Sequence, residues 1–292
     1  MTSSNGTRTH DFSTGSADRL FTALLAVKVR TPILVALLLT LFLGVLPLVA
    51  ETSECAKPST LPANETGQPR NLAGLKNQLL YYECSGAYFT DIKRQIDKAI
   101  SYITKHSRDG AKPAIVLDID ETSLSNWDEM TANDFGLIDT GPCILSKPDS
   151  TLRPEDAKWP KPESPCGFNA WILLADARPL DTLRLFQAAK ENKLAVFFVT
   201  GRHEDTNKKD DHSVHDATVE NLHKAGYSDW TDLFLKPAED KESIQQFKTA
   251  KRKQITEVGY TIIANVGDQY SDLRGGYAER VFKLPNPFYF IP

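Results

Sequence analysis

The chain has 292 residues, of which 41% are hydrophobic and 25% are charged, and its formal net charge at neutral pH is −4. This length allows one large or two small domains with a sizeable core. Neither the net charge nor any Lys/Arg block indicates a nucleic-acid polymer as partner, and the four cysteines contain no C-x-x-C pair that would support a zinc or thioredoxin-like motif.

The first 70 residues predict three segments that precede a folded domain. Residues 1–30 begin polar and rich in Ser and Thr, which is typical of a disordered or cytoplasmic flank. Residues 31–50 are uncharged and mostly Leu, Val and Ile, and Lys28 and Arg30 lie just before them. This composition and length predict either a cleaved signal sequence or an uncleaved membrane anchor. Residues 51–70 are polar, with several Pro and Thr, and predict a linker.

This arrangement places the bulk of the chain outside the cytoplasmic membrane. The protein is expected to be periplasmic or secreted, or anchored to the inner membrane by residues 31–50 if that segment is not removed. Disulfide bonds form in such compartments. We expect Cys143 to pair with Cys166, because these two bracket a long loop, which would allow Cys55 to pair with Cys84, although four cysteines permit three connectivities and the sequence does not choose among them.

The expected domain at residues 71–292 opens with two helical patterns, at residues 71–82 and 88–106, and the second has one apolar stripe for packing. Residues 114–117 are apolar and predict a buried strand, and three carboxylates follow, Asp118, Asp120 and Glu121. Carboxylates at this density are costly to bury. They become reasonable at the carboxyl edge of a parallel sheet, where they can hold a cation.

Residues 128–178 have many prolines and few long apolar runs, which predicts a loop-rich insertion beside the end of that strand. Such an insertion is positioned to shape a substrate pocket. Trp127, Trp159 and Trp171 are candidates to line it, although core packing is favoured for Trp171.

Strands and helices alternate from residue 179 onward. Helices are expected at residues 180–191, 213–226 and 238–258, and strands at residues 195–199, 233–235 and 261–266. This alternation predicts an α/β fold in which helices flank a parallel sheet and the site lies at the carboxyl edge.

Three of the predicted strands end in polar residues suited to one reaction. Asp118 and Asp120 follow the first, Thr200 follows the second, and Asp268 follows the third, with Asp272 one turn later. Each signal is weak alone, because a threonine or a Gly-Asp pair at a strand end is usually a cap or a turn. Their occurrence at the same end of successive strands predicts a metal or phosphoryl-transfer site.

These motifs resemble those of the haloacid dehalogenase (HAD) superfamily, and within it a class B-like acid phosphatase branch, subfamily IIIB, that includes plant acid phosphatases and vegetative storage proteins. The branch pattern resembles DIDETLLSN, TGR, AGY-x-x-W, YKS-x-x-R, GY-x-I, GDQWSDL and FKLPNPMYYI. This chain has DIDETSLSN, TGR, AGYSDW, FKTAKR, GYTI, GDQYSDL and FKLPNPFYFI. The resemblance covers roughly residues 87–292 and implies a Rossmann-like core and an exported, Mg²⁺-dependent acid phosphatase that acts on phosphomonoesters.

The resemblance also implies a role for each acidic residue. Asp118 would be the nucleophile that attacks phosphorus and forms an aspartyl phosphate. Mg²⁺ would be held by the Asp118 carboxylate, the main-chain carbonyl of Asp120 and Asp268, while Asp272 would orient a water molecule at the ion. The Asp120 side chain would protonate the leaving alcohol and later deprotonate the hydrolytic water.

The remaining roles fall on phosphate-binding groups and one lysine. Thr200 and the Gly201 amide would hold the phosphoryl oxygens, and Arg202 is a candidate for substrate contact. Two lysines compete for the third motif, Lys236 after a predicted strand and Lys248 in FKTAKR. We favour Lys248, because its segment matches the family motif, as the charge that balances the aspartates and the phosphoryl group.

His203, His212 and His215 lie in one polar stretch, HEDTNKKDDHSVH. His203 follows the TGR motif and is a further candidate for substrate contact. A second metal site is one interpretation of the three histidines, and a solvated loop that runs into a capped helix is the favoured one.

Other functions fit the same motifs. A catalytically inactive storage or binding protein of this fold would lack the nucleophile, whereas Asp118 is present in this chain. A dehalogenase proper would lack a second acid at the position of Asp120. Phosphotransfer to an alcohol other than water, the natural substrate and the oligomeric state are left open by the sequence.

Overall fold

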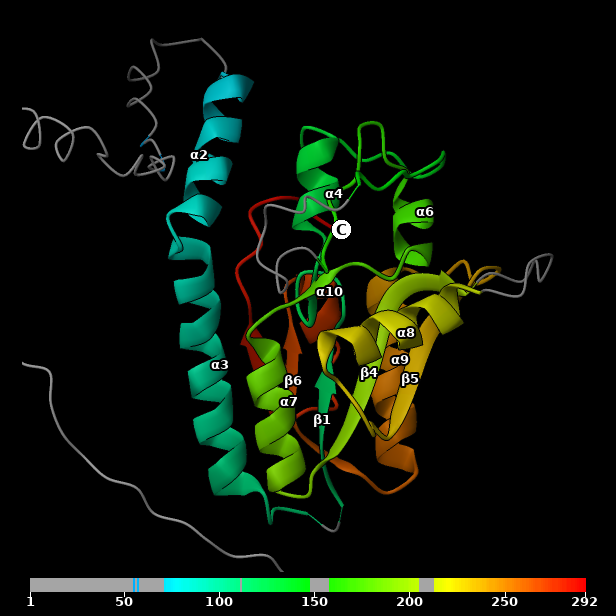
Figure 1. Cartoon of the computed structure of the whole chain (residues 1–292). Coiled ribbons are helices and arrows are strands. Elements are labelled where there is room, and N and C mark those ends of the chain that lie inside the picture. Colours follow the sequence, from blue (N-terminus) through cyan, green and yellow to red (C-terminus); the bar gives the residue numbers. More distant parts are fainter. Residues whose placement is uncertain (1–54, 56, 58–70, 111, 148–157, 205–212) are drawn as a thin grey trace, which may run out of the picture. The chain divides into compact units, whose positions relative to one another are not determined.

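The computed structural model describes residues 55, 57, 71–110, 112–147, 158–204 and 213–292 (Figure 1). Its helices are α2 (Leu72–Cys84), α3 (Ala87–His106), α4 (Trp127–Ala132), α6 (Phe168–Leu173), α7 (Thr182–Glu191), α8 (Val214–Ala225), α9 (Ile244–Glu257) and α10 (Tyr270–Leu273). Its strands are β1 (Pro113–Leu117), β2 (Leu124–Ser125), β3 (Arg178–Pro179), β4 (Ala195–Glu204), β5 (Asp232–Pro237), β6 (Thr261–Gly267) and β7 (Arg280–Lys283).

Five strands form one sheet in the order β5-β4-β1-β6-β7, and every pair in it is parallel. The strand β1 is central, so the residues that follow it are flanked by the ends of β4 and β6. Because the strands are parallel, all their carboxyl ends lie at one edge of the sheet. The predicted α/β fold with a parallel sheet flanked by helices is confirmed.

Alternate residues of β1 pack on opposite faces of the sheet, as strand geometry requires. Ile115 and Leu117 belong to a large core that includes α3, α7 and α8, whereas Ala114 and Val116 pack with Phe247 of α9 in a smaller core. The two cores explain why the strand is apolar on both sides. Continuing the alternation from Val116 directs the side chain two positions on, at residue 118, toward α9.

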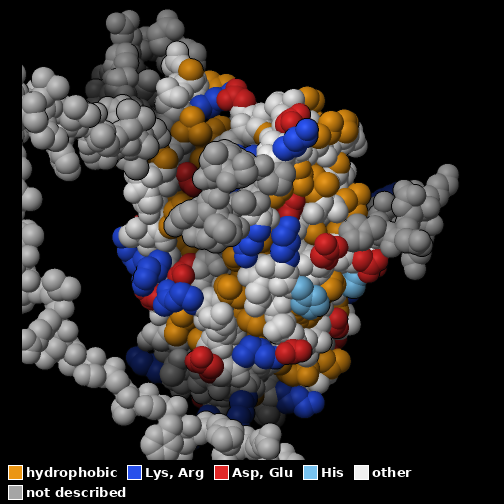
Figure 2. Space-filling view, in the orientation of Figure 1, with side chains coloured by type: hydrophobic (Ala, Val, Ile, Leu, Met, Phe, Trp, Pro, Cys, Tyr) orange, Lys and Arg blue, Asp and Glu red, His pale blue; other side chains and the backbone are white. Residues whose placement is uncertain are grey.

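The insertion, with α4 and α6, lies at the carboxyl end of the strands (Figure 1). A disulfide joins Cys143 to Cys166 across it, with their Cα atoms 4.1 Å apart. The Asn133 side chain donates to the Cys166 carbonyl and accepts from the Cys166 amide, which fixes the loop further. Figure 2 shows hydrophobic side chains gathered over this part of the visible face.

A second disulfide joins Cys55 to Cys84 at the end of α2. Both pairings are therefore present in the structure. In the described part of the chain, no helix is long and apolar enough to cross a membrane. The predicted flank, the apolar segment at residues 31–50 and nearly all of the linker lie outside the described residues.

The structure differs from the sequence-based expectation mainly at short elements. The helix expected at residues 238–258 begins at Ile244, because Ser243 accepts a hydrogen bond from the Gln246 amide and the Gln246 side chain accepts one from the Ser243 amide. This capping box fixes the first turn. The short elements α4, α6, α10 and β7 were not predicted, because six residues or fewer carry too little periodicity.

Candidate active site

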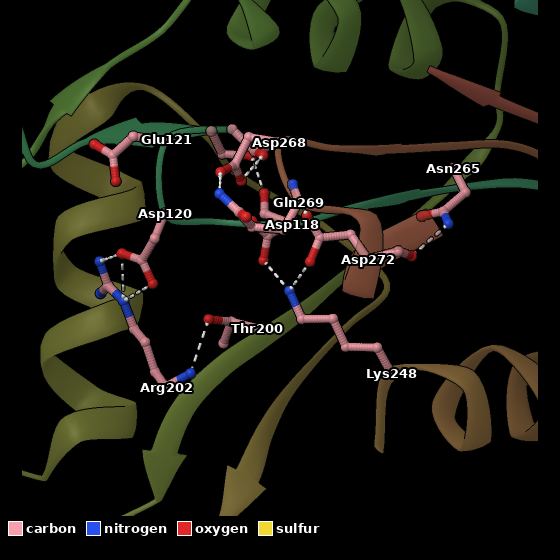
Figure 3. A network of polar contacts seen from close by, with 12 residues as sticks. Asp118, Asp120, Glu121, Thr200, Arg202, Lys248, Asn265, Asp268, Gln269 and Asp272 are labelled. Carbon is pink, nitrogen blue, oxygen red and sulfur yellow. Dashed lines mark hydrogen bonds and ion pairs between the residues drawn. The ribbon is translucent and has the colours of Figure 1, made fainter. Parts of the chain in front are cut away.

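The side chain of Asp118 lies at the carboxyl edge of the sheet, directly after β1. Its amide donates to the Val266 carbonyl at 3.0 Å, which extends the pairing of β1 with β6 by one residue. Its carboxylate is buried and points toward α9, where the Lys248 ammonium donates to Asp118 Oδ1 at 2.5 Å and to Asp272 Oδ1 at 2.7 Å (Figure 3). The lysine of FKTAKR thus joins acids that come from two different strand ends.

Asp268 enters the site from the turn between β6 and α10, and Asp272 enters it from α10. Asp268 accepts from the Thr122 hydroxyl and from the side-chain amides of Gln269 and Asn286. Asp272 Oδ2 accepts from the Gln269 amide at 2.7 Å at the start of α10. Gly267, the residue before Asp268, is required here, because a Cβ atom at that position would overlap the Asp272 side chain.

Asp118, Asp268 and Asp272 each offer a carboxylate oxygen, and these oxygens lie within 4.8 Å of one another. Burial, followed by the charge of Asp272, raises the pKa of Asp118 well above its usual value, and the same two causes raise the pKa of Asp268 to about 6. Burial would lower the pKa of Lys248, but Asp118 and Asp272 outweigh it and raise that pKa. The cluster therefore has three carboxyl groups and one ammonium group, that of Lys248, which leaves negative charge that a cation would balance.

The oxygen-only donor set of this cluster is the kind that Mg²⁺ prefers. The Asp120 side chain is not part of the cluster. Its carboxylate faces Arg202, whose guanidinium donates to both of its oxygens at 2.8–3.2 Å, and it also accepts from the Asn126 amide group (Figure 3). Burial would raise the pKa of Asp120, but the charge and hydrogen bonds of Arg202 outweigh it, and this pKa falls below its usual value.

A second buried network beside the site was not predicted from the sequence. Glu121, at a backbone φ of 52°, accepts hydrogen bonds from the Asn126 amides and from the Tyr289 hydroxyl. Burial, followed by the charge of Asp120, raises the pKa of Glu121 to about 8. The only sequence signal was the FKLPNPFYFI motif, which does not by itself say where the segment packs.

A cavity of about 340 Å³ opens beside these acids. This volume is within the range of small-molecule sites, roughly 300–1,000 Å³. Its charged or amide-bearing lining residues are Asp118, Asp120, Glu121, Asn126, Glu129, Asp139, Asn169, Arg202, His203, Lys248, Asp268, Gln269 and Asp272. Its remaining lining residues come from the insertion, from Gly201 of β4, from α9 and from residues 288–291.

The other predicted residues divide between this cavity and the rest of the fold. Gly201 lines the cavity. Thr200 is buried, its hydroxyl accepts from the Arg202 amide, and it is not among the residues that line the cavity. Lys236 lies elsewhere, where its ammonium contacts Asp240.

The histidines are not brought together in the described part of the chain. His203 lines the cavity, His215 lies beside Asp216 on the surface, and His212 falls outside the described residues.

None of the three tryptophans lines the cavity, so the prediction is wrong for Trp127 and Trp159, whereas the core packing favoured for Trp171 is confirmed. Trp159 and Trp171 are buried in the large core, and Trp127 packs edge-on against the rings of Phe135 and Phe288. The rings of Trp127 and Trp171 contact lining residues from behind. Sequence position beside the site did not distinguish a lining ring from a supporting one.

Comparisons with known proteins show the family and the fold. The chain is 30% identical over 214 residues to acid phosphatase 1 of Solanum lycopersicum, which covers 72% of each chain. It is 28% identical to vegetative storage protein 1 of Arabidopsis thaliana, over 61% of this chain and 55% of that protein. A solved structure of a class C acid phosphatase from Bacillus anthracis with tungstate bound has a similar fold, with a TM-score of 0.52 and 20% identity over 74% of this chain and 86% of that one.

The sequence model of one family also matches residues 63–292, and its description is HAD superfamily, subfamily IIIB (acid phosphatase). This match spans most of the chain, including every described residue of the site. The chain therefore belongs to the subfamily IIIB acid phosphatases of the HAD superfamily and is an enzyme of the phosphoric monoester hydrolase class.

Proposed function

We propose that this protein is an exported, Mg²⁺-dependent acid phosphatase that hydrolyses phosphomonoesters through an aspartyl phosphate. The observation that carries the proposal is the position of Asp118. Its Oδ1 is held by Lys248, no described residue donates a hydrogen bond to its Oδ2, and the side chain lines the cavity. An oriented carboxylate oxygen open to a substrate cavity is the arrangement that a nucleophile needs.

In the proposed reaction an oxygen of Asp118 attacks phosphorus and the bond to the ester oxygen breaks. Asp120 gives a proton to the departing alcohol, and then accepts one from the water that hydrolyses the aspartyl phosphate. Thr200, the Gly201 amide and Arg202 are proposed to bind phosphoryl oxygens. Lys248 keeps Asp118 oriented and offsets the charge that gathers as the phosphoryl group is transferred.

The buried acids fit a divalent cation, which would be held by Asp118, Asp268 and the main-chain carbonyl of Asp120, with Asp272 nearby. When bound, the ion would neutralise charge on the phosphoryl group. We expect exhaustive treatment with EDTA to lower turnover by about a hundredfold or more, because such an ion contributes several kcal/mol, and Mg²⁺ to restore it. Full turnover after chelation would contradict the metal assignment.

The nucleophile is tested by Asp118→Asn, which keeps the shape of the side chain and removes the attacking oxygen. We expect turnover of a phosphomonoester to fall by several orders of magnitude while the fold and phosphate binding persist. Asp128→Asn is the matched control, because Asp128 is a buried carboxylate that pairs with Arg178 and does not line the cavity. An Asp118→Asn variant that keeps a tenth of the turnover would refute the covalent mechanism.

The relatives also include storage proteins by name, so a storage or binding role is the second candidate. We favour the enzyme, because the proposed nucleophile, acid, lysine and cation ligands are all present and converge on one cavity. Phosphotransfer to added alcohols is tested in the same assay, by comparing the alcohol released with the free phosphate formed.

The proposed domain arrangement keeps residues 1–30 as a flank, residues 31–50 as a signal or anchor, residues 51–70 as a linker and residues 71–292 as the phosphatase domain. The two disulfides support export, because such bonds persist in oxidising compartments.

A further inference from the structure

The part of the cavity that lies away from the aspartates has apolar walls. The insertion, α9 and the segment at residues 284–292 supply them, and the side chains are Met130, Phe135, Leu137, Phe168, Ile172, Ile244, Phe288, Phe290 and Ile291. A phosphoryl group held at Asp118 would direct its ester group into this space. The apolar wall would therefore contact the alcohol part of the substrate rather than its phosphoryl group.

The lining offers no uncommitted lysine or arginine among the described residues. Lys248 is paired with Asp118 and Asp272, and Arg202 is paired with Asp120. Two further carboxyl groups do line the cavity. One is Glu129, which is buried and accepts a hydrogen bond from an asparagine of the same helical turn, and the other is an exposed aspartate at residue 139. A second anionic group on the ester would find these carboxyls and His203 there, and no uncommitted lysine or arginine among the described lining residues.

The buried amide groups of the lining are also committed. Asn126 donates to Asp120 and Glu121 and accepts from the Trp171 indole. Gln269 donates to an aspartate at the cluster and accepts from the Ile291 amide. Hydroxyls of a sugar-like ester would therefore find no free buried amide, and their remaining partners would be Glu129 and the exposed Asp139, Asn169 and His203.

The rim of the cavity is apolar as well. Leu137 and Phe290 both line it, yet 74% and 73% of their surfaces are exposed. Large apolar side chains that are this exposed at the mouth of a site are suited to cover an apolar ligand.

We propose that the cavity selects phosphomonoesters of uncharged, extended apolar alcohols, such as long-chain alkyl phosphates, with Leu137 and Phe290 as specificity-determining residues at its mouth. This inference rests on the proposed phosphatase function and names its substrate class.

The test is a series of butyl, hexyl and octyl phosphate below their micelle concentrations, with methyl phosphate as the smallest member. The alcohols from butyl to octyl leave almost equally well, so differences in kcat/KM report binding of the chain. We expect kcat/KM to rise about three- to fourfold per methylene, the fold-change that corresponds to about 0.8 kcal/mol. We also expect phenyl phosphate to exceed 4-carboxyphenyl phosphate by about tenfold or more.

Two variants locate the effect. Leu137→Asn and Phe290→Asn should each flatten the rise between hexyl and octyl phosphate. Val258→Asn is the control, because Val258 is 60% exposed at the end of α9 and does not line the cavity, and it should keep the rise.

A flat series, a preference for the carboxylated ester, or variants that behave like the control would overturn this inference while turnover of the esters still supported the phosphatase function. Failure to hydrolyse any ester with Mg²⁺ present would instead overturn the proposed function, and this inference with it.

Discussion

Asp120 and Arg202 form the contact that most constrains the chemistry. The guanidinium lowers the pKa of Asp120 even though the carboxyl is partly buried, yet a general acid must carry a proton when the alcohol leaves. If the phosphoryl group of the substrate competes with Asp120 for Arg202, the guanidinium no longer lowers the pKa of Asp120. The carboxyl can then take up a proton and donate it to the leaving alcohol. Arg202 would then act on the substrate and on the acid in turn.

The pH dependence of kcat/KM tests this pairing, since it reports the protonation of the free enzyme. With Asp120 required in its protonated form, kcat/KM falls as pH rises through the pKa of Asp120. Arg202→Met removes the opposing charge, so burial raises this pKa, and the fall should move to higher pH, whatever happens to the absolute rate. Arg184→Met, which breaks a surface pair with Asp97, should leave the profile in place. An identical profile for Arg202→Met would remove Asp120 from the role of acid.

Single residues at strand ends were predictable, because a carboxylate directly after a buried strand is costly to bury unless it is paired or binds a cation. The partners of Asp120 and Glu121 were not predictable in this way. Asp120 and Arg202 are separated by 82 positions, and Tyr289 and Glu121 by 168. Pairings at such separations depend on the register of whole strands, which periodicity does not specify.

At the level of elements, the long helices and central strands follow from local rules. The helix α8 begins with a Ser213–Asp216 capping box and ends at Gly226 in the left-handed region, as its sequence predicted. The start of α9 was misplaced by six residues, because Ala238 to Glu242 are also compatible with a helix, and only the cap at Ser243 decides.

The insertion depends on the disulfide between Cys143 and Cys166, which are 23 positions apart. Replacing both by Ser should lower the free energy of unfolding by about 3 kcal/mol, from the loop-closure entropy returned to the unfolded chain. Thermal unfolding measures this. Because the insertion supplies part of the cavity wall, KM for an apolar ester should rise as well.

Replacing Cys55 and Cys84 by Ser is the matched control, because that pair closes a loop of similar length, 29 positions, away from the cavity. It should reduce stability and leave KM unchanged. Equal effects of the two double variants on KM would mean that the insertion does not shape the cavity.

At the scale of the whole molecule, one parallel sheet explains why acids from distant parts of the sequence meet. The strands β1 and β6 are neighbours, so Asp118 and Asp268 follow adjacent strands at the same edge, and α9 packs on the face toward which Asp118 points. The fold was predictable to this level from alternation alone. The lysine on α9 needed the family motif, because a lysine in a charged helix is usually solvated.

The location of the enzyme is the prediction at this scale. Fractionated cells should contain the activity outside the cytoplasm, and sequencing of the mature amino terminus should show whether residues 31–50 are removed. Alkylation without reductant should label none of the four cysteines, because both pairs are oxidised. Activity in the cytoplasm with all four thiols free would contradict export.

Hydrogen bonds hold the segment at residues 284–292 against the site, among them those from Asn286 to Asp268, from Tyr289 to Glu121 and from the Ile291 amide to Gln269. Nearly the whole domain must therefore be folded before the acids near its beginning are enclosed. A chain that is still being synthesised or translocated would contain Asp118 long before residues 284–292 could complete the site around it. If the chain is exported unfolded, then as a consequence of the proposed export the enzyme would spare the phosphate esters of the compartment in which it is made and become active only where folding is completed.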